Sequence, residues 1–373
     1  MTMKVVFRVD ASLQIGTGHV MRCLTLADAL RERGASCCFV CRPHQGHLLA
    51  FIAQRGHLVL ALLELHEGAQ PNQIGTAHAH WLGTDWATDA QDTQEALSAQ
   101  TGGQPIDWLV VDHYALDACW EKALRPQAKR IMVIDDLADR SHACDLLLDQ
   151  TFGRRPEDYM PHVTDGCTLL CGSNYALLRP EFAALREYSL SRRAQPALKE
   201  LLITMGGVDN DNVTGAVLRG LKSSPLPEDS RLTVVMGQTA PWLKDVQDLA
   251  SQMPRPTQVL VGIDNMAQLM ADSDLAIGAA GATSWERCCL GLPSIMLVVA
   301  ENQLEVAKGL AKADAALLCL TGQALSKQLA VLLGKLCYDI EQVAMLSEAA
   351  AKVADGTGTG AVLARMENRL EHA

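Results

Sequence analysis

The sequence has no apolar run close to the roughly 18 residues that span a bilayer, and its first ten residues, MTMKVVFRVD, contain at most three consecutive apolar residues. It therefore lacks the form of a signal or transit peptide. Lys and Arg are not clustered, and the formal net charge is −11. This charge argues against nucleic acid as a partner, because phosphate binding relies on clustered cations. We expect a cytoplasmic protein with neither a membrane partner nor a nucleic-acid partner.

Two common nucleotide-binding fingerprints are also missing. Neither G-x-G-x-x-G nor G-x-x-x-x-G-K-[ST] occurs in the sequence, so NAD, FAD and ATP hydrolysis lose their usual signature. Twelve cysteines are scattered through apolar segments of a long chain, which favours reduced thiols over a disulfide framework. The C-x-x-C spacing within Cys37–Cys41 has no second pair that would complete a zinc site, so buried thiols are the preferred interpretation.

The sequence does contain a regular alternation of short apolar segments with longer amphipathic ones, which is typical of βαβ units and parallel sheets. It breaks at Arg179-Pro180, where a charged stretch follows, and begins again at LLITM, residues 201–205. A chain of 373 residues is longer than one core usually supports. We therefore predict two Rossmann-like α/β domains in tandem, 1–180 and 199–373, joined by a linker at 181–198. The last helical segment, near 358–370, could pack on the first domain.

Three turns rich in small residues follow predicted strands, at residues 15–19, 205–209 and 278–286. In parallel α/β sheets, ligands bind at the carboxyl ends of strands, where loops meet helix N-termini. Glycines allow a ligand to approach the backbone, and the exposed amides there favour phosphate. These turns predict a diphosphate held by backbone amides.

Each turn also has a purely structural interpretation. His19 begins the helix predicted over 19–33, where the helix N-terminus keeps the imidazole neutral and able to accept a proton; it could equally be an ordinary first-turn residue. Thr283-x-x-Glu286 fits a capping box, in which Glu286 would bind only backbone. Asp112-His113-Tyr114 closes a strand on the same sheet edge as His19, so it could face the same site or only end the strand.

Other polar clusters give weaker signals for a metal. Asp135-Asp136 has the ligand type that suits Mg²⁺, but a solvated strand end is the preferred interpretation because no further ligand has a matching spacing. The pairs His44-x-x-His47 and His78-x-His80 lie in polar stretches without supporting cysteines or acids, which makes metal binding there improbable.

The motifs together resemble a known family. They are R-x-D-x-x-x-Q-I-G-x-G-H-x-x-R (8–22), D-H-Y (112–114), Y-A-L-L-R-x-E-F (175–182), M-G-G-x-D (205–209), G-A-T-S-W-E (281–286) and Asn302-Gln303. In this order and spacing the chain resembles the UDP-2,4-diacetamido-2,4,6-trideoxy-β-L-altropyranose hydrolases of bacterial pseudaminic acid biosynthesis. These are relatives of the glycosyltransferase that adds N-acetylglucosamine to the peptidoglycan lipid precursor. The helical region beyond about residue 320 carries no motif with a role.

The resemblance implies a glycosyltransferase B type fold with the substrate in the interdomain cleft, and neither a metal nor a cofactor. It implies that His19 is the general base and that Tyr114 assists at the sugar. Glu286 would hold the ribose hydroxyls, with Thr283 and Ser284 near the diphosphate. The other implied substrate contacts are Arg8, Asp10, Gly16, Gly18, Arg179, Gly206, Gly207, Asn302 and Gln303.

The expected reaction is hydrolysis of this UDP-sugar at the anomeric carbon, which releases UDP and 2,4-diacetamido-2,4,6-trideoxy-L-altrose. An inverting hydrolysis through an oxocarbenium-like transition state needs a base that activates water, and a neutral histidine suits this task. UDP is a good leaving group, so amide donors can stabilise its charge without a metal. The alternatives are an inverting UDP-sugar glycosyltransferase and a non-catalytic nucleotide-sugar binding protein, which would not need His19.

Overall fold

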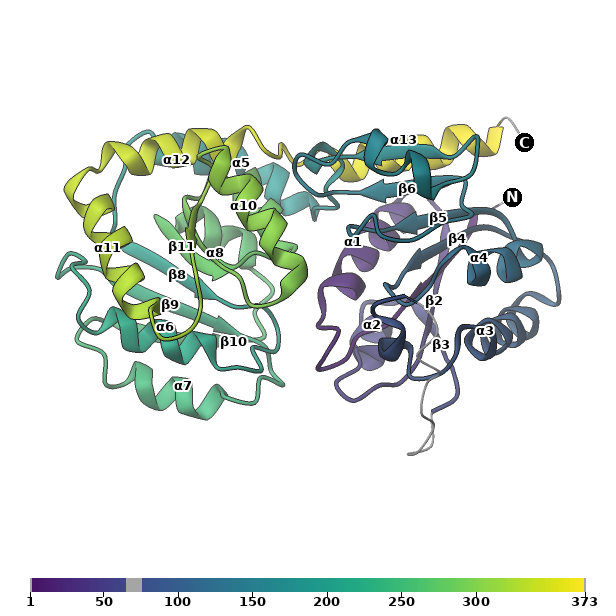
Figure 1. Ribbon diagram of the computed structural model, residues 1–373, viewed down its shortest axis with the longest axis horizontal. Helices are drawn as coiled ribbons and strands as arrows, with labels where there is room; N and C mark the ends of the chain where they lie inside the picture. Colours follow the sequence, from purple (N-terminus) through teal and green to yellow (C-terminus); the bar gives the residue numbers. More distant parts are fainter. Residues whose placement is uncertain (1, 65–75, 372–373) are drawn as a thin grey trace. The chain divides into compact units, whose positions relative to one another are not determined.

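The computed structural model describes residues 2–64 and 76–371, and it divides the chain into two compact units (Figure 1). The first unit comprises Met1–Leu177 with Thr359–Ala373, and the second comprises Leu178–Gly358. Each is an α/β unit built on one parallel sheet, which agrees with the alternation in the sequence.

The first unit has a seven-stranded sheet in the order β3-β2-β1-β4-β5-β6-β7. Its strands are β1 Lys4–Val9, β2 Ser36–Cys41, β3 Leu58–Ala61, β4 Ile106–Asp112, β5 Ala128–Ile134, β6 Leu146–Asp149 and β7 Thr168–Cys171. Helices α1 Gly18–Glu32, α2 Leu49–Gln54 and α13 Gly358–Glu371 contribute to one face, and α3 Trp86–Thr101 and α4 Ala118–Leu124 to the other (Figure 1). Strands covered on both faces read as continuous apolar runs: Phe7 packs on the α1 side and Val6 on the α3 side.

The second unit has a six-stranded sheet in the order β10-β9-β8-β11-β12-β13. Its strands are β8 Glu200–Thr204, β9 Arg231–Met236, β10 Thr257–Val261, β11 Leu275–Ala279, β12 Ser294–Leu297 and β13 Leu317–Cys319. Its helices are α5 Pro180–Arg193, α6 Val213–Leu221, α7 Leu243–Ala250, α8 Met266–Asp272, α9 Thr283–Cys289, α10 Leu304–Lys312, α11 Leu325–Tyr338 and α12 Glu341–Ala351. The buried core on one face of this sheet includes residues of α6, α7, α11 and α12.

The observed division differs from the predicted boundaries at the expected linker, and it groups the last helix with the first unit, which the sequence had left open. Most of the expected linker, 181–198, is helix α5, which is fastened to the second unit: Arg186 donates to the carbonyl of Ala351 at 2.7 Å, and the Ser189 hydroxyl donates to that of Leu290 at 2.7 Å. Helix α13 is grouped with the first unit, where Val362 and Met366 are fully buried in its core. The charged Arg186 of α5 thus faces carbonyl groups of the second unit, which a composition-based boundary cannot detect.

Two further features of the structure are the lengths and polarity of its helices and the state of its cysteines. Within 2–64 and 76–371, the helices are too short or too polar to serve as a membrane span. The twelve cysteines are all free thiols, as the sequence predicted. Burial raises the pKa of the Cys38 thiol to about 12, which makes the C-x-x-C segment a poor redox centre because the thiolate is the reactive form.

Candidate functional site

His19 lies in the first turn of α1, directly after the loop that leaves β1. The loop closes through hydrogen bonds from the Gly16 amide to the Ser12 carbonyl at 2.8 Å and from the Ile15 amide to the Ser12 hydroxyl at 2.9 Å. Gly16 has φ +80°, a left-handed conformation that favours glycine. A Cβ at Gly16 or at Gly18 would meet nothing within 4 Å, so space remains beside the loop.

Asp112 holds the His19 ring from the end of β4, the strand next to β1. His19 Nδ1 and Asp112 Oδ1 are 2.6 Å apart, and Arg22 donates from Nε to Asp112 Oδ2 at 2.6 Å and from Nη2 to Oδ1 at 2.7 Å. The Asp112 side chain is 0% exposed. Burial favours its neutral form, but the charge of Arg22 and the hydrogen bonds from Arg22 and His19 outweigh this and hold the pKa of Asp112 well below its usual range.

The contact with Asp112 assigns the tautomer of His19. A carboxylate only accepts hydrogen bonds, so the 2.6 Å contact requires a hydrogen on Nδ1. Arg22 Nη2 lies 3.2 Å from the same nitrogen, but it donates to Asp112 Oδ1 at the shorter distance of 2.7 Å. In the neutral ring, Nε2 then carries the lone pair, and among the described residues it has no protein hydrogen-bond partner. The arrangement matches that of a general base oriented by a carboxylate.

Tyr114 packs against His19 edge to face, with ring centroids 4.6 Å apart. Its hydroxyl donates to Asp136, whose carboxylate also accepts from Arg22 Nη1 at 2.8 Å. Burial and the nearby charge of Asp136 raise the pKa of the Tyr114 phenol well above its usual value. Tyr114 therefore stays protonated, and its ring packs against the His19 ring and restricts its position. Asp136 links the Tyr114 hydroxyl to Arg22.

The structure adds Arg22 and Asp136 to this cluster, although no role at the site was predicted for them. For Asp112, which the sequence left open between facing the site and ending the strand, it gives a direct contact with His19. The rings of His78 and Trp81, from the 3₁₀ turn Ala79–Leu82 and the residue before it, are stacked 4.6 Å apart and lie 5.3 and 5.6 Å from the Tyr114 ring. Because β4 and β5 follow β1 in the sheet, an acidic residue at the end of either strand was the sequence signal that could have identified a partner for His19.

Asp135 is not a solvated strand end, whereas the side chain of Asp136 is 23% exposed. Asp135 is 0% exposed and pairs with Arg140 at 2.7 Å, and it accepts from the Tyr159 hydroxyl at 2.7 Å. Across the described ranges, no three His, Cys, Asp or Glu side chains are grouped so that they could hold a metal ion. Both carboxylates are therefore used inside the unit.

Arg8 and Asp10, which the motif placed at the substrate, are buried at the end of β1. Arg8 pairs with Asp10 at 2.6 Å and with Asp89 at 2.7 Å, and all three side chains are 0% exposed. Asp10 also accepts from the Arg42 amide at 2.7 Å. In this structure the two residues support the strand end that leads into the His19 loop, and their contact with a substrate stays a prediction.

In the second unit, the turn after β8 depends on glycine at two points. Gly206 has φ +92° and open space at its Cβ position, whereas a Cβ on Gly237 would lie 2.0 Å from the Gly207 carbonyl oxygen. The amides at the start of α6 are already taken: Asp209 accepts from Val213 at 2.9 Å. Asp209 also accepts from the amide of residue 214, and the Asn212 side chain from that of residue 215. A ligand could therefore approach the backbone of this turn closely, but the three amides at the start of α6 are not free to bind it.

The turn after β11 leads into α9 and places Glu286 beside Arg179. The Glu286 carboxylate lies 3.6 Å from the Arg179 guanidinium, which also pairs with Glu181 at 2.9 Å. Burial raises the pKa of Glu286, opposed by the charge of Arg179. The alternative capping box is not formed, because Ala282 precedes the helix and no side chain caps it. The side chain of Glu286 is thus not committed to the backbone.

The other predicted contacts in this unit differ in accessibility. Thr283 is half-buried and Ser284 is 0% exposed, and both hydroxyl oxygens accept from Arg287, at 3.3 and 3.2 Å. Asn302 is exposed in the 3₁₀ turn Glu301–Gln303, and Gln303 accepts from the Val299 amide at 3.2 Å. Ser284 is therefore an internal residue of the first turn of α9, whereas Thr283 and Asn302 present surface.

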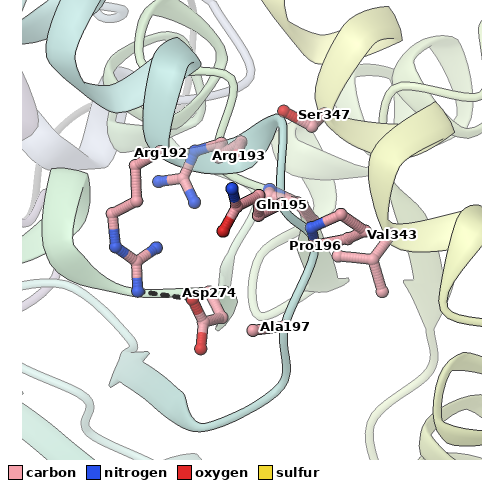
Figure 2. Close-up of a pocket in the computed structure, with 9 residues that line it drawn as sticks. Arg192, Arg193, Gln195, Pro196, Ala197, Asp274, Val343 and Ser347 are labelled. Atoms are coloured by element: carbon pink, nitrogen blue, oxygen red, sulfur yellow. Dashed lines mark hydrogen bonds and ion pairs between the residues drawn. The ribbon is translucent and has the colours of Figure 1, made fainter.

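A small hollow lies elsewhere in the second unit (Figure 2). Arg192 pairs there with Asp274 at 2.5 Å. Arg193 donates to three carbonyls, those of Met270, Ser273 and Leu290, at 2.7–3.0 Å. Because both guanidinium groups have protein partners, the hollow is not a candidate for the functional site.

Comparisons with known proteins support a nucleotide-sugar context. Residues 201–358 match the family model of the glycosyltransferase family 28 C-terminal domain. The UDP-2,4-diacetamido-2,4,6-trideoxy-beta-L-altropyranose hydrolase of Campylobacter jejuni is 26% identical over 83% of this chain and 97% of its own length. An uncharacterized protein of Methanocaldococcus jannaschii is 25% identical over 81% of this chain, but the match spans only 57% of that protein. The spore coat polysaccharide biosynthesis protein SpsG of Bacillus subtilis is 24% identical over 83% of this chain and 81% of its own length.

Solved structures identify the fold. The crystal structure of MurG from Acinetobacter baumannii matches with a TM-score of 0.68 at 16% identity, covering 98% of this chain and 99% of that one. The calicheamicin glycosyltransferase CalG4 matches with a TM-score of 0.62 at 13% identity, covering 99% and 98%. The chain therefore has the predicted fold, two Rossmann-like domains of the glycosyltransferase B type. At these identities the likeness shows the fold alone.

Proposed function

We propose that this protein hydrolyses UDP-2,4-diacetamido-2,4,6-trideoxy-β-L-altropyranose at the anomeric carbon and releases UDP and 2,4-diacetamido-2,4,6-trideoxy-L-altrose. Support comes from the Campylobacter hydrolase, whose similarity extends over 97% of its length, and from the family 28 domain match. The observation that carries the proposal is the 2.6 Å contact of His19 with buried Asp112, which leaves Nε2 as the proton acceptor.

In the proposed reaction, a water oxygen forms a bond to the anomeric carbon while the bond from that carbon to the diphosphate oxygen breaks. The water proton moves to His19 Nε2, and the electron pair of the broken bond leaves with UDP. The imidazolium that forms is stabilised by the negative charge of Asp112. Arg22 and Tyr114 keep the ring and the carboxylate in place, so little reorganisation is needed at the moment of reaction.

Residues of the second unit are proposed to hold the nucleotide. Glu286 is suited to accept from the two ribose hydroxyls, because its carboxylate is not used for capping and lies 3.6 Å from Arg179. Thr283, Gly206 and Asn302 are proposed to contact the diphosphate or the sugar. Since UDP leaves readily as a diphosphate, the proposed reaction is independent of metal and cofactor.

The test is to incubate the full chain with a panel of UDP-sugars in EDTA and to follow UDP release and the anomeric product by NMR. We expect release without an acceptor, inversion at the anomeric carbon, and a loss of about 10²- to 10⁴-fold in kcat for His19→Ala, with UDP binding retained. Dependence of turnover on an added divalent metal would contradict the metal-independent mechanism. The free thiols favour a reducing compartment, and we propose the cytoplasm.

The second candidate is an inverting UDP-sugar glycosyltransferase, favoured by the family 28 domain match and the MurG-like fold. It uses the same donor-binding residues and the same base, but a sugar or lipid hydroxyl takes the place of water. Turnover that requires an added acceptor would favour this candidate over the hydrolase. UDP-sugar binding with no turnover under either condition would favour a non-catalytic nucleotide-sugar binding protein.

A further inference from the structure

Arg287 on α9 is a fully buried arginine without a carboxylate partner. Its exposure is 0%, and within the described part of the chain it forms no ion pair. Other buried arginines pair with aspartates, namely Arg8, Arg22, Arg42 and Arg140. Burying a charge is costly unless it is paired. Burial lowers the pKa of Arg287 to about 10, so at neutral pH the side chain still carries its charge.

The guanidinium lies under the loop between β11 and α9. Its Nη2 donates to the Ala279 carbonyl at 2.8 Å and to the Ser284 hydroxyl at 3.2 Å, and its Nη1 donates to the Thr283 hydroxyl at 3.3 Å. Its Nε is buried and has no hydrogen-bond partner in the structure. A Cβ on Gly278 would lie 2.6 Å from Nη1. Glycine at that position therefore makes room for the guanidinium.

The direction of these hydrogen bonds has a chemical consequence for Thr283. An arginine has only donors, so the Thr283 oxygen acts as acceptor toward Arg287, and its own hydrogen points to another group. Thr283 is half-buried, whereas Ser284 is fully buried. Of the two hydroxyls, the one on Thr283 is therefore the donor that a bound anion can reach.

We propose that Arg287 is a positioning residue for the diphosphate. It orients the Thr283 hydroxyl as a donor toward a phosphate oxygen, and it places a buried positive charge beneath the loop between β11 and α9. The inference deepens the proposed function and rests on it, because it specifies how the UDP group is held. Arg287 does not touch the ligand. It acts through Thr283 and through the field of its charge, which a low-dielectric surrounding screens little.

Arg193 provides a matched control, because it too is a buried arginine of the second unit that forms no ion pair with a described residue (Figure 2). It differs in its partners: Nε, Nη1 and Nη2 each donate to a backbone carbonyl, including that of Ser273 at 2.7 Å. The carbonyl groups at the C-terminal end of α8 stabilise the positive charge of Arg193. Replacement of Arg193 therefore measures the loss of a buried structural arginine alone.

The experiment compares the affinities of the full chain for UDP and for uridine by calorimetry, in the wild type and in Arg287→Met, Arg287→Lys and Arg193→Met. We expect Arg287→Met to weaken UDP binding about 10- to 100-fold and to change uridine binding less than threefold. Arg287→Lys should recover part of the loss because it restores the charge. Arg193→Met should lower the unfolding midpoint but leave the ratio of the two affinities unchanged.

A double-mutant cycle keeps the inference testable if Arg287→Met folds poorly. Thr283→Val removes the hydroxyl with little change in shape, and it should weaken UDP but not uridine. Combined with Arg287→Lys, its effects should be less than additive, because both changes disturb one hydrogen bond. An unchanged ratio of UDP to uridine affinity in Arg287→Lys and Thr283→Val would overturn the inference. A wild type that binds neither ligand would instead overturn the proposed function.

Discussion

Replacing Asp112 by Asn removes the negative charge that orients His19 while nearly preserving the shape of the side chain. In the wild type, Asp112 accepts from His19 Nδ1 at 2.6 Å and from Arg22 at 2.6 and 2.7 Å, and it is fully buried. An Asn side chain can place its NH₂ group against Nδ1. The ring would then carry its hydrogen on Nε2 and could not accept a proton from water.

The size of the effect follows from the burial of this pair. Removing one partner of a buried charge pair costs about 3–5 kcal/mol. In the proposed transition state the His19 imidazolium forms that pair with Asp112, so the barrier should rise by about this amount. At 1.36 kcal/mol per factor of ten, kcat for UDP release should fall about 10²- to 10⁴-fold. KM should change less, because the nucleotide contacts are proposed to come from the second unit.

The assay is steady-state UDP release at saturating UDP-sugar, with urea unfolding measured on the same samples. Glu121→Gln is the matched control: Glu121 is also fully buried and lies 2.7 Å from Nδ1 of a histidine, His142. It should lose a similar free energy of unfolding while its kcat stays within about threefold of the wild type. If folded Asp112→Asn retained kcat within threefold, the assignment of the His19 tautomer by Asp112 would be refuted.

Three further outcomes are expected. Glu286→Gln should weaken uridine and UDP to the same degree, about tenfold, because the proposed contact is to ribose; calorimetry with both ligands checks this, and a loss confined to UDP would contradict it. Gly237→Ala should weaken UDP at least about tenfold, since its Cβ would lie 2.0 Å from the Gly207 carbonyl oxygen and displace that turn; unchanged UDP affinity in the folded variant would argue against a role for the turn. Burial and the charge of Asp136 raise the pKa of Asp149 to about 6, so its protonated form is favoured in the folded state. The stability from this group is present below pH 4 and is lost as the pH rises through 6, by about 3 kcal/mol. Urea unfolding from pH 4 to 7 should show that loss in the wild type and not in Asp149→Asn, and parallel curves would refute it.

The sequence predicted the fold well because its signals are local. Apolar strands such as WLVVD and DLAIG, separated by amphipathic segments, indicate parallel sheets without knowledge of their order. His19 was also recognisable, since a glycine-flanked turn after a strand and before a helix is visible in a few residues. Its function remains a proposal, but its place at the start of α1 agrees with that local pattern.

Parts of the candidate site could not be predicted, because their contacts join distant residues. The sequence places Asp112 on the same sheet edge as His19, but the two are 93 positions apart, and only the adjacency of β4 to β1 shows that the carboxylate contacts the ring. The same limit applies to Glu286, whose spacing from Thr283 fits a capping box equally well; the folded chain brings Arg179 beside it instead. Arg287 carried no sequence signal, since its significance lies in a buried charge that forms no ion pair with any described residue.

The amino-acid sequence by itself determined that this protein consists of parallel α/β domains with glycine-bearing turns at strand ends, because periodicity and backbone freedom are properties of neighbouring residues. Only the tertiary structure decided which polar side chains meet: the order of strands in each sheet is non-local. That order gives His19 a buried carboxylate partner, removes Arg8 and Asp10 from the surface, and leaves the charge of Arg287 without a carboxylate beneath the loop that precedes α9.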